Sequence, residues 1–330
     1  MQRGSGSLTA PPSSALRRAR RDPLGRVPPP ILLGTGIVSV QIGAGLAART
    51  FGTVPAAGLT GLRLWAATLL LAALGVRPTI RAVRGVIADR AWRDAFVVLA
   101  FGVTLGVMNF SIYQSFARIP LGIAVTIEFL GPLAVAIASS RRAIDLLWVA
   151  LAGAGVTLLG ISDVSVTRIA SVTTGQAPPS STVLTGMLFA LTAATAWAGY
   201  ILLSASTGRR FSGSSGLVLA MGIGSLVVAP SALLSGGRAL LKPAVLGVGL
   251  AIGLLSSVIP YRFELETLRR VSARVFGIWM SLEPAVAALV GVLLLSQALS
   301  APQWIAICCV VVASAGAALG EGRSAAAPQA

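Results

Sequence analysis

One apolar segment decides the class of fold to which this chain belongs: Ile119-Pro-Leu-Gly-Ile-Ala-Val-Thr-Ile-Glu-Phe-Leu-Gly-Pro-Leu-Ala-Val-Ala-Ile-Ala-Ser-Ser140. Glu128 is its only charged residue. At about 1.5 Å of rise per residue, a helix of this length crosses a lipid bilayer and places Glu128 near the middle of the hydrocarbon. Because a charge there costs roughly 2.5–3.5 kcal/mol, intramembrane carboxylates normally face a bundle interior or a polar cavity. The segment therefore predicts a pathway for a solute, an ion or a proton.

The composition of the whole chain agrees with a membrane protein. Of its 330 residues, 55% are hydrophobic and 11% are charged, and the mean hydropathy is +0.86. Soluble domains carry about 25% charged residues. At roughly 20 residues per span, the length allows about ten transmembrane helices with short loops. We therefore predict an all-α integral membrane protein that lies in the lipid bilayer.

The net charge of +16 raises nucleic acid as a candidate partner. The basic residues do not gather on one face or one helix, however, and lie instead at the ends of apolar segments. That distribution is typical of topology signals in membrane proteins. We therefore expect no binding of nucleic acid.

Three features of the sequence limit its chemistry. It contains no histidine, the commonest metal ligand. Its two cysteines, Cys308 and Cys309, are adjacent, so on a helix they point about 100° apart and suit neither a disulfide nor a shared metal. It contains no Gly-Lys-Ser or Gly-Lys-Thr phosphate-binding motif. We predict no metal and no other cofactor, assign any proton chemistry to carboxylates, and regard an intramembrane enzyme as a remote alternative.

Apolar runs between charged or Pro/Gly/Ser-rich breaks predict ten membrane-spanning helices. The predicted spans are 31–49, 54–76, 94–116, 119–140, 143–162, 182–205, 213–235, 243–265, 275–296 and 301–320. The longest connection, 163–181, divides the spans into five and five. Residues 1–30 are rich in Arg, Pro and Ser and predict a disordered basic tail, and residues 321–330 form a C-terminal tail.

The distribution of Lys and Arg predicts the orientation of the chain. With these spans, the side that holds both termini carries 19 of the basic residues and the other side carries 5. Cytoplasmic loops are enriched in Lys and Arg. We therefore expect both termini to be cytoplasmic and the connection 163–181 to lie on the outer side.

The two halves of the chain resemble each other. Arg118 is followed fourteen residues later by Pro132, and Arg270 is followed fourteen residues later by Pro284. Since each half holds an odd number of spans, the second half must insert upside down relative to the first. An inverted repeat places a substrate site near the midplane, between the halves. The repeats are predicted to be residues 31–162 and 182–320.

Two carboxylates beside prolines are the first candidates for transport. Glu128 and Pro132 share a helix face, and the proline removes the hydrogen bond to the carbonyl of Glu128. Glu283 directly precedes Pro284, so the two acids are expected to approach each other across the repeat axis. Two carboxylates in a low-dielectric site favour protonation of one, which suits exchange of a proton against an amine. The alternative is that both pairs are helix kinks with acids bonded inside the bundle.

Five further side chains are candidates to line the site. Asn109 and Tyr261 are equivalent in the repeat, and Tyr113 shares a helix face with Asn109. Their hydrogen-bonding groups suit a zwitterion or serve as contacts between helices. Arg63 either receives a substrate carboxylate or neutralises an acid. Trp279 lines the cavity or belongs to the core or the lipid-facing surface.

Other side chains near these candidates receive a structural interpretation. Trp197 and Tyr200 are expected more often in the core or towards lipid than in a cavity. Glu264 and Glu266 precede Arg269 and Arg270 closely and favour ion pairs at the cytoplasmic interface.

Several motifs resemble the threonine/homoserine exporter family of the EamA-type drug/metabolite transporter superfamily. The string Ala117-Arg-Ile-Pro-Leu-Gly-Ile-Ala-Val-Thr-Ile-Glu-Phe-Leu-Gly-Pro-Leu133 resembles its fourth helix. The later motifs follow its eighth to tenth helices in order: Ser257-Val-Ile-Pro-Tyr261, Leu268-Arg-Arg270, Met280-Ser-Leu-Glu-Pro-Ala285 and Gln303-Trp-Ile-Ala-Ile307. The resemblance covers roughly residues 31–320.

The resemblance implies a ten-helix exporter of small neutral amino acids in the inner membrane of a cell, driven by proton antiport with alternating access. Two residues depart from the family. Gln297 stands where the family usually has Glu, and Arg262 stands where a small residue is expected, so coupling or substrate range differs if these positions matter. Export of another metabolite or a drug, and import, remain alternatives. The sequence leaves the oligomeric state open.

Overall fold

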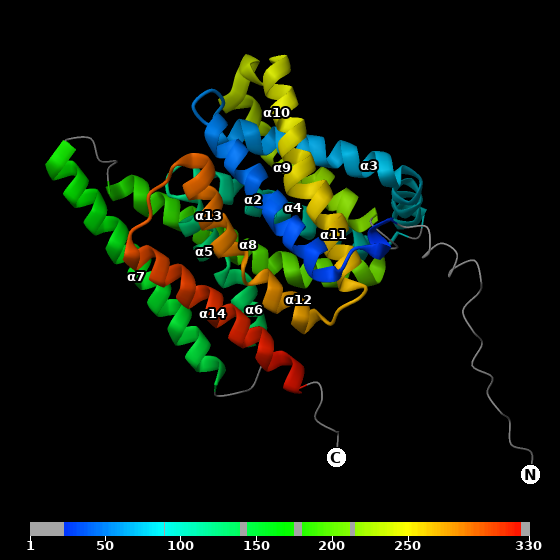
Figure 1. Cartoon of the computed structure of the whole chain (residues 1–330). Helices are drawn as coiled ribbons and strands as arrows, with labels where there is room; N and C mark the ends of the chain where they lie inside the picture. The colour runs from blue at the N-terminus through cyan, green and yellow to red at the C-terminus, as the bar shows by residue number, and fades with distance from the viewer. Residues whose placement is uncertain (1–22, 89, 139–143, 175–179, 212–214, 325–330) are drawn as a thin grey trace, which may run out of the picture.

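The structure is a computed structural model that describes residues 23–88, 90–138, 144–174, 180–211 and 215–324. Within these ranges it is all-helical, with no β-strand (Figure 1). Nine of the described segments are long and apolar enough to cross a membrane, and Asp145–Leu159 is a shorter apolar helix. The chain is therefore a multi-pass membrane protein, as its composition predicts.

The helices follow the predicted spans closely. In chain order they are η1 (Pro23–Arg26), α2 (Pro29–Thr50), α3 (Ala56–Ala88), α4 (Trp92–Phe116), α5 (Leu121–Glu128), α6 (Leu130–Ala138), α7 (Asp145–Thr174), α8 (Ser180–Arg210), α9 (Ser215–Gly236), η2 (Gly237–Leu241), α10 (Pro243–Gly253), η3 (Leu254–Val258), α11 (Ile259–Leu268), α12 (Ala273–Met280), α13 (Glu283–Leu295) and α14 (Ala301–Ser324).

Several boundaries differ from the sequence prediction. Helix α7 continues to Thr174, so most of the predicted connection 163–181 is helical; this stretch holds no Gly or Pro before Gly175. Helix α3 continues past its apolar part to Ala88. Helix α14 runs to Ser324, into the predicted C-terminal tail. The predicted N-terminal tail lies outside the described residues up to residue 22.

Helices from the two ends of the sequence interleave in the bundle. Helix α3 packs on α9, α4 packs on α8 and α9, α2 packs on α11 and α13, and α7 packs on α14. Figure 1 shows α7 and α14 as a long pair along one side of the bundle. Glycines permit the closest crossings: a Cβ on Gly131 would stand 2.1 Å from the backbone oxygen of Ala194.

Three of the spans are interrupted near their middles, each just before a proline. Helix α5 gives way to α6 at Phe129, ahead of Pro132, and α12 gives way to α13 at 281–282, ahead of Pro284. The π-helical turn η3 interrupts α10 and α11 ahead of Pro260. A proline has no N–H for the carbonyl four residues earlier, so regular helical hydrogen bonding fails there. At each break, the carbonyl four residues before the proline therefore lacks its helical N–H partner.

The two kinked spans meet at one end and diverge at the other. Helix α5 packs on α13, and a Cβ on Gly122 would stand 2.6 Å from Cα of Ala288. At the same end, the backbone N–H of Leu121 donates a hydrogen bond of 3.0 Å to Oε1 of Gln297. Beyond the kinks, α6 packs on α8 and α14, whereas α12 packs on α14 and α2. The divergence leaves room for a cavity below the α5–α13 contact.

Candidate functional site

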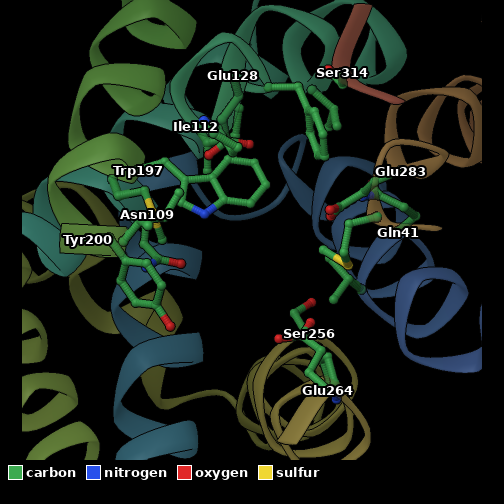
Figure 2. Close-up of a pocket in the computed structure, with 18 of the residues that line it drawn as sticks. Gln41, Asn109, Ile112, Glu128, Trp197, Tyr200, Ser256, Glu264, Glu283 and Ser314 are labelled. Atoms are coloured by element: carbon green, nitrogen blue, oxygen red, sulfur yellow. The ribbon is translucent and has the colours of Figure 1, made fainter. Parts of the chain in front are cut away.

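A cavity of about 540 Å³ lies at the helix breaks. Figure 2 shows side chains from α2, α4, α5, α8, η3, α11, α13 and α14 around it. Arg63 of α3, Pro132 and Leu133 of α6 and residues of α12 such as Phe276 and Met280 also line it. All three interrupted spans therefore contribute to one cavity.

Three carboxyl groups line the cavity: Glu128, Glu264 and Glu283. Glu128 ends α5 and Glu283 begins α13, and both are buried. Gln41 of α2 donates a hydrogen bond of 3.0 Å from Nε2 to Oε1 of Glu283. The N-terminus of a helix favours a negative charge, so the start of α13 suits the Glu283 carboxylate. Glu283 interacts electrostatically with both other acids.

Arg63 is the one basic side chain that lines this cavity in the part of the chain that the structure describes. Its Nη2 donates a hydrogen bond of 3.0 Å to the backbone oxygen of Ser256. That oxygen is available because Pro260, four residues later, has no N–H to offer it. The guanidinium Cζ also lies 5.2 Å from the centre of the Tyr113 ring. Arg63 is thus held between a backbone dipole and an aromatic face, both of which favour a cation.

Several buried polar atoms at the cavity have no hydrogen-bond partner among the described residues. They are Oε2 of Glu283, Oε1 of Gln41, Nε of Arg63, the hydroxyl of Tyr113 and Oγ of both Ser256 and Ser314. A buried polar atom without a partner costs about 1–3 kcal/mol, so such atoms in a native protein normally bind water or a ligand. This set includes hydrogen-bond donors and acceptors, together with a carboxylate and a guanidinium. The cavity is therefore suited to a small molecule with groups of both charges.

The predicted site residues mostly meet at this cavity. Those that line it are Glu128, Glu283, Asn109, Tyr113, Tyr261, Arg63 and the kink residue Pro132. Asn109 donates a hydrogen bond of 2.8 Å to the backbone oxygen of Leu105, so its Nδ2 is used within its own helix. Pro284 lies behind Glu283 and does not line the cavity.

Trp279 was a further candidate, and it is not among the lining residues. Phe276, Gly277 and Met280 form the lining face of α12. Trp279 lies about 100° around the helix from Met280, which turns it away from that face.

Two polar residues of the cavity, Gln41 and Ser256, are not among the candidates from the sequence. Trp197, Tyr200 and Glu264 also line it, although the sequence favours a structural role for each. Gln41 could have been predicted from the sequence, because it is a polar amide in the middle of the first apolar run. Glu264 was grouped with Glu266 as an interfacial acid. In the structure Glu266 pairs with Arg269 and Arg270, whereas Glu264 lines the cavity.

The two departures from the family pattern lie away from the cavity lining. Gln297 accepts the hydrogen bond from the Leu121 N–H at the α5–α13 contact, a role that needs an oxygen and not a charge. Arg262 is an exposed residue of α11. Neither contacts the acids or Arg63 in any hydrogen bond or ion pair found in the described residues.

Comparison with known proteins identifies the family. The EamA-like transporter family model matches residues 184–319. The threonine/homoserine exporter RhtA of Salmonella typhimurium (strain LT2) is 38% identical over 301 residues, which cover 88% of this chain and 91% of that protein. The chain belongs to the threonine/homoserine exporter family.

Further comparisons agree with this membership. The exporter RhtA of Escherichia coli (strain K12) is 37% identical over 297 residues, with the same coverage of both chains. One protein of known crystal structure is similar over 90% of this chain and 99% of its own, with a TM-score of 0.52 and 18% sequence identity, so that likeness concerns the fold alone. As a member of a transporter family, this threonine/homoserine exporter homologue is a membrane transporter and not an enzyme.

Proposed function

We propose that this protein exports small neutral amino acids of the threonine and homoserine type across the inner membrane, in exchange for protons. One observation supports the proposal most directly: a single guanidinium and a group of carboxylates line the same buried cavity in a chain 38% identical to named exporters of these amino acids. A zwitterion carries the two charges that such a cavity would pair.

The charges of the cavity suggest how the substrate lies. Its carboxylate would pair with Arg63 and accept a hydrogen bond from the Tyr113 hydroxyl, which has no partner among the described residues. Its ammonium would pair with Glu128 and Glu283, and Oε1 of Gln41 is a free acceptor beside Glu283. Charge-assisted hydrogen bonds of this kind are about twice as strong as neutral ones. Binding would therefore require both ends of an amino acid.

An inverted five-helix repeat would supply the two conformations of an alternating-access carrier. The packing is consistent with such a repeat: α4 packs on α8, while the counterpart pair α11 and α2 also pack together. The counterparts α3 and α9, α5 and α13, and α7 and α14 pack on each other. In folds of this type the halves rock around a fixed central site.

The orientation predicted from Lys and Arg assigns a direction to the cavity. The closed α5–α13 contact would face outwards, and the divergent α6 and α12 would face the cytoplasm. Substrate would then enter from the cytoplasm, and opening of the α5–α13 contact would release it. On the outer side, protonation of Glu128 or Glu283 would neutralise the partner of the ammonium and expel the amine.

The test is efflux of radiolabelled threonine and homoserine from proteoliposomes, with and without a proton gradient. Wild-type efflux should accelerate with the gradient, and Glu128→Gln should retain binding of threonine but lose the gradient response. Asp94→Asn is the matched control, because Asp94 pairs with Arg210 away from the cavity. Normal gradient-coupled efflux in Glu128→Gln would count against the mechanism, and absence of any amino-acid efflux would count against the substrate class.

A further inference from the structure

The cavity is larger and more acidic than a small neutral amino acid requires. Its volume of about 540 Å³ lies in the range of sites that bind drug-sized ligands, roughly 300–1,000 Å³. Three carboxyl groups and one guanidinium line it among the described residues. A zwitterion adds one charge of each sign and so does not balance this excess. In the pose proposed above, the single ammonium pairs with Glu128 and Glu283, so Glu264 has no ionic partner in the ligand.

Glu264 is the acid to which the proposed pose of the zwitterion assigns no role. Glu128 and Glu283 belong to the kinked spans, whereas Glu264 belongs to α11 (Figure 2). Within the described residues, no basic side chain forms an ion pair with Glu264, since Arg269 and Arg270 both pair with its neighbour Glu266. Figure 2 shows Glu264 and Ser256 on the same side of the cavity and Glu128 on another side.

The surroundings of Glu264 favour a cation. Tyr261 from its own helix and Tyr200 from α8 line the same cavity. Tyr200 is fixed by Phe101, whose ring centre lies 5.2 Å from its own. Aromatic faces attract ammonium groups within about 6 Å. Ser256, which is only 5% exposed, lines the same cavity; its Oγ has no hydrogen-bond partner among the described residues and lies beside Gly43 of α2.

The geometry points to a second ammonium subsite, formed by Glu264, Ser256, Tyr200 and Tyr261. Its ligand is the side-chain ammonium of an amino acid that carries two amines, such as 2,4-diaminobutyrate, ornithine or lysine. The α-ammonium of that ligand pairs with Glu128 and Glu283, and its α-carboxylate pairs with Arg63. The transport part of this inference rests on the proposed function, whereas the binding part does not.

The inference is supported by the unpaired buried atoms as well as by the acids. Oε2 of Glu283, in a residue only 7% exposed, has no partner among the described residues and lines the same cavity. Glu283 interacts electrostatically with Glu128 and with Glu264. A ligand with two amines therefore has acidic groups available for both of them, Glu128 and Glu283 for the α-ammonium and Glu264 for the second ammonium.

The experiment compares matched pairs of inhibitors of threonine efflux in proteoliposomes. Each diamino acid is paired with its neutral isostere: 2,4-diaminobutyrate with norvaline, ornithine with norleucine. In wild type, the diamino member should inhibit roughly tenfold more strongly, the size of effect expected for one well-placed ionic contact. Glu264→Gln should abolish that preference. Glu266→Gln, which removes an acid two residues further along α11, should retain the preference for the diamino inhibitor.

Two results would overturn the subsite: equal inhibition by both members of each pair in wild type, or a preference that Glu264→Gln leaves intact. If the protein transports no amino acid, ornithine binding is followed instead by the fluorescence of Trp197, with Trp197→Phe to assign the signal. Saturable binding of ornithine that Glu264→Gln weakens would then support the subsite and reject the proposed function. No saturable signal with ornithine would reject the subsite.

Discussion

Arg63 on α3 donates a hydrogen bond of 3.0 Å to the backbone oxygen of Ser256, a residue 193 positions away in η3. The oxygen is free because Pro260 offers it no N–H. A helix break in the second half of the chain thus fixes the charged side chain that the first half contributes to the cavity. The bond orients the guanidinium and leaves its Nε without a partner among the described residues.

Replacement of Arg63 should weaken binding of the substrate carboxylate. Arg63→Ala should raise the KM for threonine by tenfold or more, since a charge-assisted contact is worth roughly 1.5–3 kcal/mol. Arg63→Lys should recover part of the loss, because lysine keeps the charge but not the planar fork. The same efflux assay with threonine amide as inhibitor gives the control: wild type should prefer threonine to its amide, and Arg63→Ala should not. A KM unchanged in both variants would show that Arg63 serves structure only.

Loss of the amide donor at Gln41 should destabilise the fold. Gln41→Leu leaves Oε1 of Glu283 without its hydrogen bond in a buried position, at a cost of about 1–3 kcal/mol. Thermal unfolding in detergent should show this as a lower Tm. The double variant Gln41→Leu with Glu283→Gln should lose less stability than the two single variants lose together, because the carboxylate that needs the hydrogen bond is no longer present. Strict additivity would contradict a direct interaction between the two side chains.

The close approach of α2 to η3 predicts a specific steric effect at Gly43. A Cβ there would stand 2.1 Å from Oγ of Ser256 and 3.2 Å from Cβ of Leu255. Gly43→Ala should therefore lower stability by about 1–3 kcal/mol, the usual cost of overpacking. Removal of the hydroxyl in Ser256→Ala should restore much of the loss. A mild Gly43→Ala effect with no rescue would mean that the helices separate freely at this point.

The α5–α13 contact should depend on Gly122. A Cβ at Gly122 meets the backbone of Ala288 at 2.6 Å, so neither helix can adjust by a change of rotamer alone. Gly122→Ala should force the helices apart and reduce transport several-fold. The matched control is Gly153→Ala on α7, where a Cβ meets no atom within 4 Å. Equal transport by the two variants would contradict a functional role for the closed contact.

Gln297 should hold the same contact through a hydrogen bond. Gln297→Ala removes the acceptor for the Leu121 N–H, at about 1 kcal/mol, and should make the closed end easier to open. Phe116 lines both the main cavity and a pocket beside Gln297, so a cysteine there reports on opening. In a background with Cys308 and Cys309 replaced by serine, Phe116→Cys should react faster with an impermeant thiol reagent when Gln297→Ala is added. Gln297→Glu keeps an acceptor and should not accelerate labelling.

Much of the candidate site could be predicted from the sequence, because several of its residues are unusual for a transmembrane helix. Glu128 interrupts an apolar span, and Pro132 and Pro284 interrupt helices, so each is conspicuous without knowledge of its neighbours. Glu264 was misread because Glu266, Arg269 and Arg270 lie close by in sequence and form a sufficient ion-pair set. Glu264 and Glu266 differ in the direction in which they project from α11, and only the tertiary structure shows that direction.

The sequence alone determined that the chain crosses the membrane many times and where most spans begin and end. Each apolar segment enters the membrane because its own transfer from water to lipid is favourable, and charges and prolines mark where it ends or kinks. These effects are local, so the spans can be predicted without knowledge of the tertiary structure. Tertiary structure decided which polar groups meet: Gln41 with Glu283, 242 positions apart, and Arg63 with Ser256. In helices that are apolar on every side, no stripe marks the inward face. The packing of neighbouring helices sets that face, and with it the side chains that line the cavity.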